Sequence, residues 1–121
     1  FVSVGAIDPQ FYALLLEKLG LAKDPDFQDQ NDAKNWSGLR ERVAGVFLTK
    51  TRDEWTAILE HSDVCFAPVL NLTEAPEHPH NVSRGTFIEA FGVTQPAPAP
   101  RYSLTLADAP RAARTVSIDD I

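Results

Sequence analysis

Methionine is absent from this chain, and cysteine occurs once, as Cys65. A single cysteine excludes an intrachain disulfide, so we expect a reducing, cytoplasmic compartment. No apolar run approaches the roughly 20 residues that a membrane-spanning helix needs, and we expect no membrane partner. Because methionine is missing and the sequence opens inside an apolar run, we also expect the chain to be a piece of a longer protein.

Positive charge is scarce as well. The 11 Lys and Arg residues are outnumbered by 17 Asp and Glu residues, which gives a formal net charge of -6. This balance argues against a surface that binds nucleic acid phosphates. The 121 residues, 44% of them hydrophobic, are enough for one modest core and predict about one domain.

Short apolar runs and helical periodicity predict an α/β fold. Residues 1–7 form a β-branched run typical of a buried strand. Asp8-Pro9 is a helix start, Gly20 is the matching stop, and the residues between them repeat at helical spacing. A second helix is expected from Trp36, and the pattern Thr51-Arg52-Asp53-Glu54 predicts a capping box at the start of a third.

The second half of the chain is richer in proline. The run at 64–70 is predicted to be an edge strand or an extended loop, because Pro68 cannot donate a ladder hydrogen bond. A short helix is expected at 73–77, polar turns after it, and a strand at 86–91. Residues 94–103 are expected to be extended, since their prolines disfavour helix and sheet alike. Residues 104–121 have little periodicity and are expected to be loose if nothing packs against them.

These elements predict a small α/β domain of short strands flanked by helices over residues 1–95. An extended proline-rich segment is expected to follow over residues 96–121.

The Asp8 side chain has two possible roles. As the residue before a helix-starting proline, it is typical of an N-cap that accepts hydrogen bonds from free backbone N–H groups. Alternatively, the preceding strand delivers its carboxylate to the rim of a cleft for acid or base work. The two roles are compatible.

Other chemistry-bearing residues have plainer interpretations. His78 and His80 lie around a proline without an obvious further ligand, so a solvated loop is expected rather than a metal site. Cys65 is expected to be a small buried hydrophobe, and Trp36 and Trp55 to be packing residues. The chain shows neither a glycine-rich phosphate loop nor a Gly-x-Ser-x-Gly elbow, and spacing alone indicates no self-sufficient active site.

Several stretches nevertheless resemble one family in the correct order. They are VGAIDPQFYALLLEKLGL, TRDEW, SDVCFAPVLNLTEA, HPHNVSRGTF and PAPRYS. Together they are similar to the C-terminal third of α-methylacyl-CoA racemases, which belong to the family III CoA-transferase superfamily. The resemblance runs from Phe1 to about Thr105. It implies the small domain of that fold.

The resemblance also implies a reaction and partners. The racemases epimerise the carbon next to a 2-methylacyl-CoA thioester: a base removes the α-proton, an enolate forms, and an acid returns a proton on the other face. The coenzyme A thioester is the substrate, and no further cofactor is implied. The family forms an interlocked homodimer, in which the large domain of one subunit and the small domain of the other enclose each site.

The family's motif Gly-Ala-Ile-Glu-Pro-Gln-Phe, which contains a functional glutamate, has one counterpart in this sequence. The matching stretch here runs from Gly5 to Phe11 and holds Asp8 in place of the glutamate. The resemblance implies that Asp8 is an accessory catalytic carboxylate, although its side chain is shorter by one methylene, about 1.5 Å. Ile7 is expected to line the acyl side of the cleft.

Two other functions remain open. A family III CoA-transferase has the same fold but moves coenzyme A between carboxylic acids through an aspartate nucleophile, which is expected outside this chain. The isolated chain is also expected to be inactive by itself, as a non-catalytic module that associates with a large domain.

Overall fold

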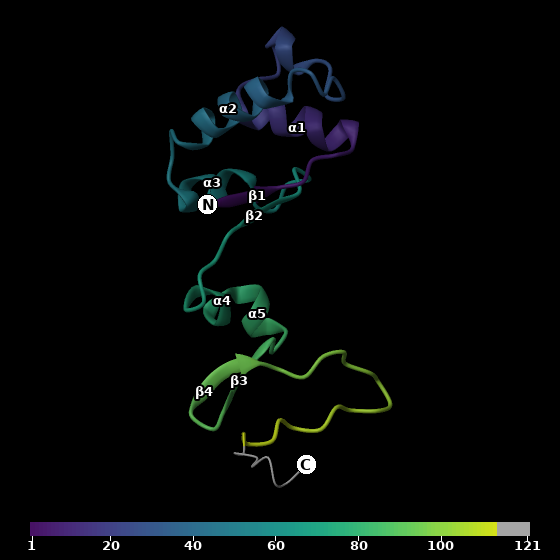
Figure 1. Cartoon of the computed structure of the whole chain (residues 1–121), viewed down its shortest axis with the longest axis vertical. Coiled ribbons are helices and arrows are strands. Elements are labelled where there is room, and N and C mark those ends of the chain that lie inside the picture. Colours follow the sequence, from purple (N-terminus) through teal and green to yellow (C-terminus); the bar gives the residue numbers. More distant parts are fainter. Residues whose placement is uncertain (114–121) are drawn as a thin grey trace, which may run out of the picture. The chain divides into compact units, whose positions relative to one another are not determined.

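The structure, a computed structural model, describes residues 1–113 and divides the chain into two compact units, Phe1–Val69 and Leu70–Ile121 (Figure 1). The first unit contains β1 (Val2–Val4), α1 (Pro9–Leu19), the 3-10 turn η1 (Pro25–Phe27), α2 (Trp36–Phe47), α3 (Arg52–Leu59) and β2 (Phe66–Pro68). The second contains α4 (Glu74–Glu77), α5 (Pro79–Ser83), β3 (Phe87–Ala90) and β4 (Val93–Pro96). These helices and short strands confirm the predicted α/β class. The predicted domain limit at residue 95 stays a prediction.

Helix α1 begins and ends where the sequence predicts. Pro9 occupies the first turn, in which its missing N–H costs no hydrogen bond. Gly20 adopts a left-handed conformation with φ of 74°, and its N–H donates to the carbonyl of Glu17 over 3.0 Å. The N–H of Leu21 then reaches back to the carbonyl of Leu16, which closes the helix.

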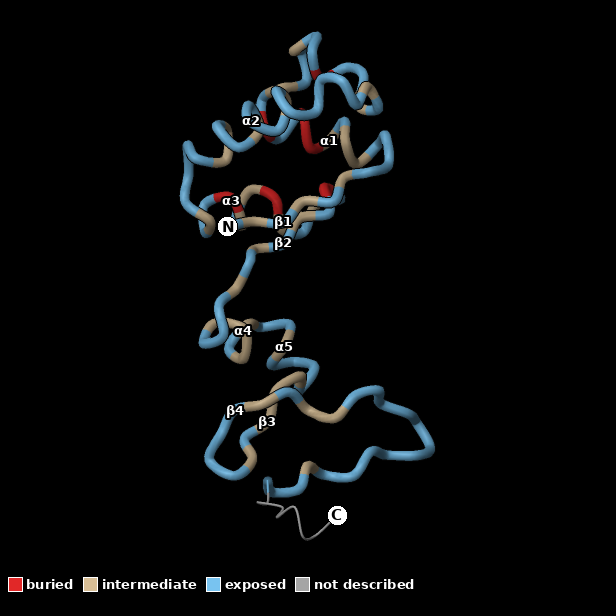
Figure 2. Tube along the Cα trace, in the orientation of Figure 1, coloured by how far each residue is buried: buried red, intermediate tan, exposed pale blue. Residues whose placement is uncertain are grey.

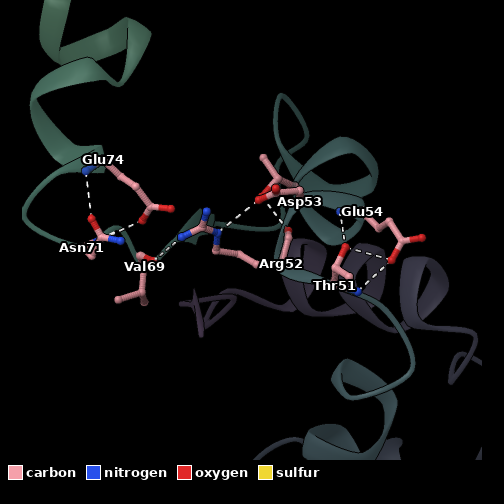
Figure 3. Close-up of polar contacts among 8 residues, drawn as sticks. Thr51, Arg52, Asp53, Glu54, Val69, Asn71 and Glu74 are labelled. Carbon is pink, nitrogen blue, oxygen red and sulfur yellow. Dashed lines mark hydrogen bonds and ion pairs between the residues drawn. The ribbon is translucent and has the colours of Figure 1, made fainter.

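Helix α3 starts with the predicted capping box, which the structure confirms (Figure 3). The Thr51 hydroxyl accepts from the N–H of Glu54 over 3.2 Å, and the Glu54 carboxylate accepts from the N–H of Thr51 over 2.8 Å. The next residue, Arg52, donates from Nη1 to the carbonyl of Val69 over 3.2 Å. The start of α3 is therefore tied to the end of the unit.

Strands β1 and β2 pair antiparallel, with Val2 opposite Pro68 and Val4 opposite Phe66. The run at 64–70 therefore includes a strand, and the sheet of two strands accommodates Pro68 because each strand is an edge. One further bond, from the N–H of Gly5 to the carbonyl of Cys65 over 3.0 Å, extends the pairing toward α1.

The core of the first unit joins α1, α3 and the residues before β2 (Figure 2). Its buried members are Leu15, Leu19, Trp55, Leu59 and Val64. Side chains from α2 and the strands pack against this cluster, and burial of each large apolar side chain contributes about 1.5–3 kcal/mol. The indole N–H of Trp55 donates to the carbonyl of Phe47 over 2.9 Å, which leaves no unpaired donor in the core.

Two packing predictions are wrong. Trp36 is 55% exposed: it is the first residue of α2, lies outside the core cluster, and donates its indole N–H to the carbonyl of Gln30 over 3.0 Å. Cys65 is exposed, because it adopts a left-handed conformation with φ of 51° directly after the fully buried Val64. Trp55, 3% exposed, confirms the packing prediction for the other tryptophan.

The second unit corrects two expectations. The polar stretch after residue 77 contains α5, which is capped by the His78 ring nitrogen Nδ1 accepting from the N–H of His80 over 3.3 Å. Residues 93–96 form β4, which pairs antiparallel with β3 across a tight turn at Phe91 and Gly92, both with positive φ. Pro96 is tolerated because it ends an edge strand. Residues 104–113 contain no helix or strand, and the predicted loose segment beyond them, 114–121, lies outside the described residues.

Candidate functional site

Asp8 lies in the loop between β1 and α1, at the N-cap position of the helix. Its backbone is extended, with φ of -69° and ψ of 143°, and its carbonyl accepts from the N–H of Tyr12 over 2.9 Å. The side chain, however, accepts no capping hydrogen bond, so the predicted side-chain cap is wrong. Within residues 1–113 the exposed Asp8 carboxylate has no hydrogen bond or ion pair, and it is free to meet an external group.

The backbone around Asp8 is held by contacts from elsewhere in the first unit. The N–H of Ile7 donates to the carbonyl of Gly5 over 2.8 Å in a tight turn. The Gln30 side-chain amide donates to two successive carbonyls of the loop, Ala6 at 3.1 Å and Ile7 at 2.8 Å. The sequence gives no signal for Gln30, because it lies in a polar stretch typical of any surface connection.

A cavity of about 450 Å³ opens beside this loop. Residues of the loop, α1, α2 and the connection before α2 line it: Val4, Gly5, Ala6, Ile7, Tyr12, Leu15, Gln30, Asn31, Trp36, Val43 and Phe47. Ile7 is 80% exposed and lies at the rim. The lining is mainly apolar and aromatic, which suits a hydrocarbon group. The role of Ile7 in substrate binding stays a prediction. The catalytic role of Asp8 also stays a prediction; Asp8 follows Ile7 in sequence but is not among the lining residues.

Tyr12 adds a polar group to the cavity wall. Its hydroxyl donates to the carbonyl of Phe27 over 3.1 Å, and burial raises the pKa of Tyr12. The phenol is therefore neutral near pH 7 and holds η1 against α1. Among the lining residues that the structure describes there is no histidine, lysine, aspartate or glutamate.

The two histidines that could have suggested a metal lie together at the start of α5. His78 caps α5 and His80 is exposed in its first turn, both in the second unit. In the described part of the chain, no three histidine, cysteine, aspartate or glutamate side chains form a group that could hold a metal ion.

None of the helices described is long and apolar enough to cross a bilayer.

Comparison with known proteins gives a consistent result. The model of CoA-transferase family III matches residues 1–117. The chain is 41% identical over 121 residues to the alpha-methylacyl-CoA racemase of Mus musculus and 42% identical over 101 residues to that of Homo sapiens. It is 34% identical over 102 residues to a CaiB/baiF CoA-transferase family protein of Caenorhabditis elegans.

These alignments cover most of the chain but little of each relative. They span 99%, 83% and 84% of this chain, and 31%, 26% and 28% of the mouse, human and nematode proteins respectively. The chain therefore corresponds to about a third or less of the length of the curated relatives it matches.

Proposed function

This chain belongs to CoA-transferase family III, and from that premise we propose that the protein containing it epimerises the carbon next to a 2-methylacyl-CoA thioester. The observation that carries the proposal is the 41% identity to a protein named alpha-methylacyl-CoA racemase over 99% of the chain. The family match also confirms the resemblance of the motifs between Phe1 and Thr105 and the small-domain fold that it implied.

The proposed chemistry needs only proton transfer. A base removes the proton from the α-carbon, the electron pair delocalises into the thioester carbonyl as an enolate, and an acid returns a proton to the opposite face. No bond to coenzyme A is broken and no electron acceptor is consumed. We therefore propose that the reaction uses no cofactor, with the coenzyme A thioester serving as substrate.

Within this chain we assign the chemistry to Asp8 and the acyl contact to Ile7. The Asp8 carboxylate is exposed and unpaired in the described residues, so binding a partner group would not require breaking an existing contact. Ile7 precedes it on the rim of the apolar cavity, which suits the hydrocarbon part of the substrate. Asp8 would act as an accessory carboxylate, and the histidine, lysine, aspartate or glutamate that completes the proton transfer would come from outside the cavity lining, which contains none.

The remaining groups are proposed to come from outside the chain. We propose an interlocked homodimer, in which the small domain of one subunit faces the large domain of the other. Residues 1–121 alone are then inactive and serve as an association module. The acyl-CoA substrate suggests fatty acid metabolism, and the single cysteine supports a cytoplasmic compartment.

The proposal is tested with the full-length protein that contains this chain. When the full-length protein is incubated with a 2-methylacyl-CoA in deuterium oxide, the α-proton should exchange for deuterium, which NMR detects. The isolated chain should give no exchange. Asp8→Asn should lower turnover about 100-fold or more, the usual contribution of a general acid or base. Asp63→Asn, which changes another exposed aspartate of the first unit, is the matched control. Full turnover in Asp8→Asn would remove the catalytic role of Asp8.

A second reaction is favoured by the name of the nematode relative. A protein 34% identical over 84% of the chain is called a CoA-transferase family protein. Transfer of coenzyme A from a thioester to a free carboxylic acid, with no α-proton exchange, would replace the racemase proposal with this one.

A further inference from the structure

Gln30 makes an unusual contact for a residue in a polar connection. Its side-chain amide donates to the carbonyls of Ala6 and Ile7, at 3.1 and 2.8 Å, across more than 20 residues of sequence. An amide NH₂ has two donors, so one side chain can satisfy both carbonyls at once. The side chain is partly buried, and its bonds end immediately before Asp8.

The loop has few other means of staying in place. The Asp8 carboxylate makes no bond of its own in the described residues, and the side chain of Ile7 is 80% exposed. The loop is tied at its start by the bond from Gly5 to the carbonyl of Cys65, and at its end by the bond from Tyr12 to the carbonyl of Asp8. Between these ties, Gln30 supplies the contact from a different segment that fixes the peptide groups leading into Asp8.

Gln30 is itself fixed by the start of α2. Its carbonyl accepts from the Trp36 indole N–H over 3.0 Å, and both residues line the cavity. The chain of contacts thus runs from Trp36 through Gln30 to the carbonyls before Asp8. This arrangement also accounts for an exposed tryptophan with a satisfied donor.

We propose that Gln30 is a positioning residue that holds the backbone from which the Asp8 carboxylate extends, so that the carboxylate can reach the proton it transfers; this role rests on the proposed function. A carboxylate must approach within hydrogen-bonding distance of the proton or water on which it acts. Displacement of a reacting group by about 1 Å can cost on the order of 100-fold in rate. The effect is expected on turnover, because Gln30 acts through Asp8 and not through the coenzyme.

The experiment compares matched glutamines in the full-length protein. Gln30→Met keeps the length of the side chain and removes both donors, and we expect kcat to fall about ten- to 100-fold with KM changed less. Gln28→Met is the control, because Gln28 also donates to two carbonyls, Ala22 at 3.2 Å and Asp24 at 3.0 Å, but neither belongs to the loop. Gln28→Met should leave kcat unchanged.

A double variant separates positioning from general destabilisation. If Gln30 acts through Asp8, then Gln30→Met should have little further effect in the Asp8→Asn background. Amide hydrogen exchange in a peptide spanning residues 5–12 should also become faster in Gln30→Met and not in Gln28→Met. Equal losses of kcat in both backgrounds, or unchanged loop exchange, would overturn the proposal.

The outcomes also distinguish this proposal from the one on which it rests. If Asp8→Asn lowers turnover and Gln30→Met does not, only the positioning role fails. If Asp8→Asn keeps full turnover, the catalytic role of Asp8 fails and the positioning role fails with it. The same variants are compared by coenzyme A transfer if that is the reaction the unmodified protein catalyses.

Discussion

The two units of the chain treat their apolar side chains in opposite ways. In Phe1–Val69, seven hydrophobic residues are buried, and five of them form one cluster. In Leu70–Ile121, none of the residues described, which end at 113, is buried (Figure 2). Seven of its large apolar residues are instead exposed: Leu72, Val82, Phe91, Val93, Tyr102, Leu104 and Leu106.

This difference in burial indicates which unit can be stable by itself. Burial of apolar area is the main favourable contribution to folding, so the first unit has its own source of stability. The second is held by hydrogen bonds. They are the β3–β4 ladder, the pair between Asn71 and Glu74, the His78 cap of α5, and those from the Arg101 guanidinium to the carbonyls of Arg84 and Gly85. An isolated hairpin of two strands is marginal in water. We therefore expect the second unit to open locally far more often.

The largest effect is expected from deleting core volume. Leu59 is fully buried, and Leu59→Ala should lower the free energy of unfolding by about 2–5 kcal/mol. Leu72 is 94% exposed, and the same truncation there should change it by less than about 0.5 kcal/mol. Urea unfolding followed by tryptophan fluorescence is recorded for both variants and reports the unfolding of the first unit, which contains both tryptophans.

A similar loss in Leu72→Ala would contradict the comparison, because it would show that Leu72 contributes to the same cooperative core. If Leu59→Ala is too unstable to measure, Leu59→Val gives the smaller truncation. The loss of unfolding free energy in Leu59→Val should still exceed that in Leu72→Ala.

Backbone protection should show the next largest effect. Amides in α3 open only when the core opens, whereas those of β3 and β4 lie in a unit without buried residues in its described part. Hydrogen exchange should therefore be about 100-fold slower, or more, in α3 than in the hairpin. Equal protection in both would mean that the second unit is stabilised by something other than its local hydrogen bonds.

Sequence reasoning succeeds where the cause is local. The Asp8-Pro9 start and Gly20 stop of α1, and the capping box at Thr51, depend on residues within one or two turns. It fails where neighbours in space decide. The strand β4 forms in a proline-rich stretch because β3 provides a partner, and Trp36 lies outside the core cluster, where its N–H is paired with the Gln30 carbonyl.

In the candidate site, too, some features follow from local sequence and others from contacts between distant segments. Asp8 and Ile7 are found from a motif, and their place on the loop before α1 follows from the strand and helix signals around them. The cavity and the contact from Gln30 require α2 and the connection before it to fold onto the loop. No local pattern specifies which polar residue of that connection will reach the loop.

Each unit contains one pair of residues that exchange two hydrogen bonds near a helix start, which allows a smaller test. Thr51 and Glu54 exchange hydrogen bonds at the start of α3, as do Asn71 and Glu74 before α4 (Figure 3). Thr51→Ala should lower the free energy of unfolding by about 1 kcal/mol, because α3 carries the core. Asn71→Ala should leave the tryptophan-monitored transition unchanged, with any effect confined to exchange in α4. Thr51→Ser, which keeps the hydroxyl, should restore most of the loss.

The smallest effect is the pH dependence of the α3 cap. The pKa of Glu54 is lowered from its ordinary value of 4.5, first by the hydrogen bond from the N–H of Thr51 and then by the Thr51 hydroxyl. A pKa lower in the folded than in the unfolded chain stabilises the fold above 4.5, and this contribution is lost as the pH falls through the folded value.

Glu54→Gln removes the titration while keeping an oxygen that can accept from the Thr51 N–H. The difference in thermal midpoint between the unmodified chain and Glu54→Gln should therefore be constant near pH 7 and shrink below pH 4.5. A difference that stays constant down to pH 3 would show that the charge on Glu54 does not strengthen the cap. The cap would then stabilise α3 through its hydrogen bonds alone, which Glu54→Gln retains.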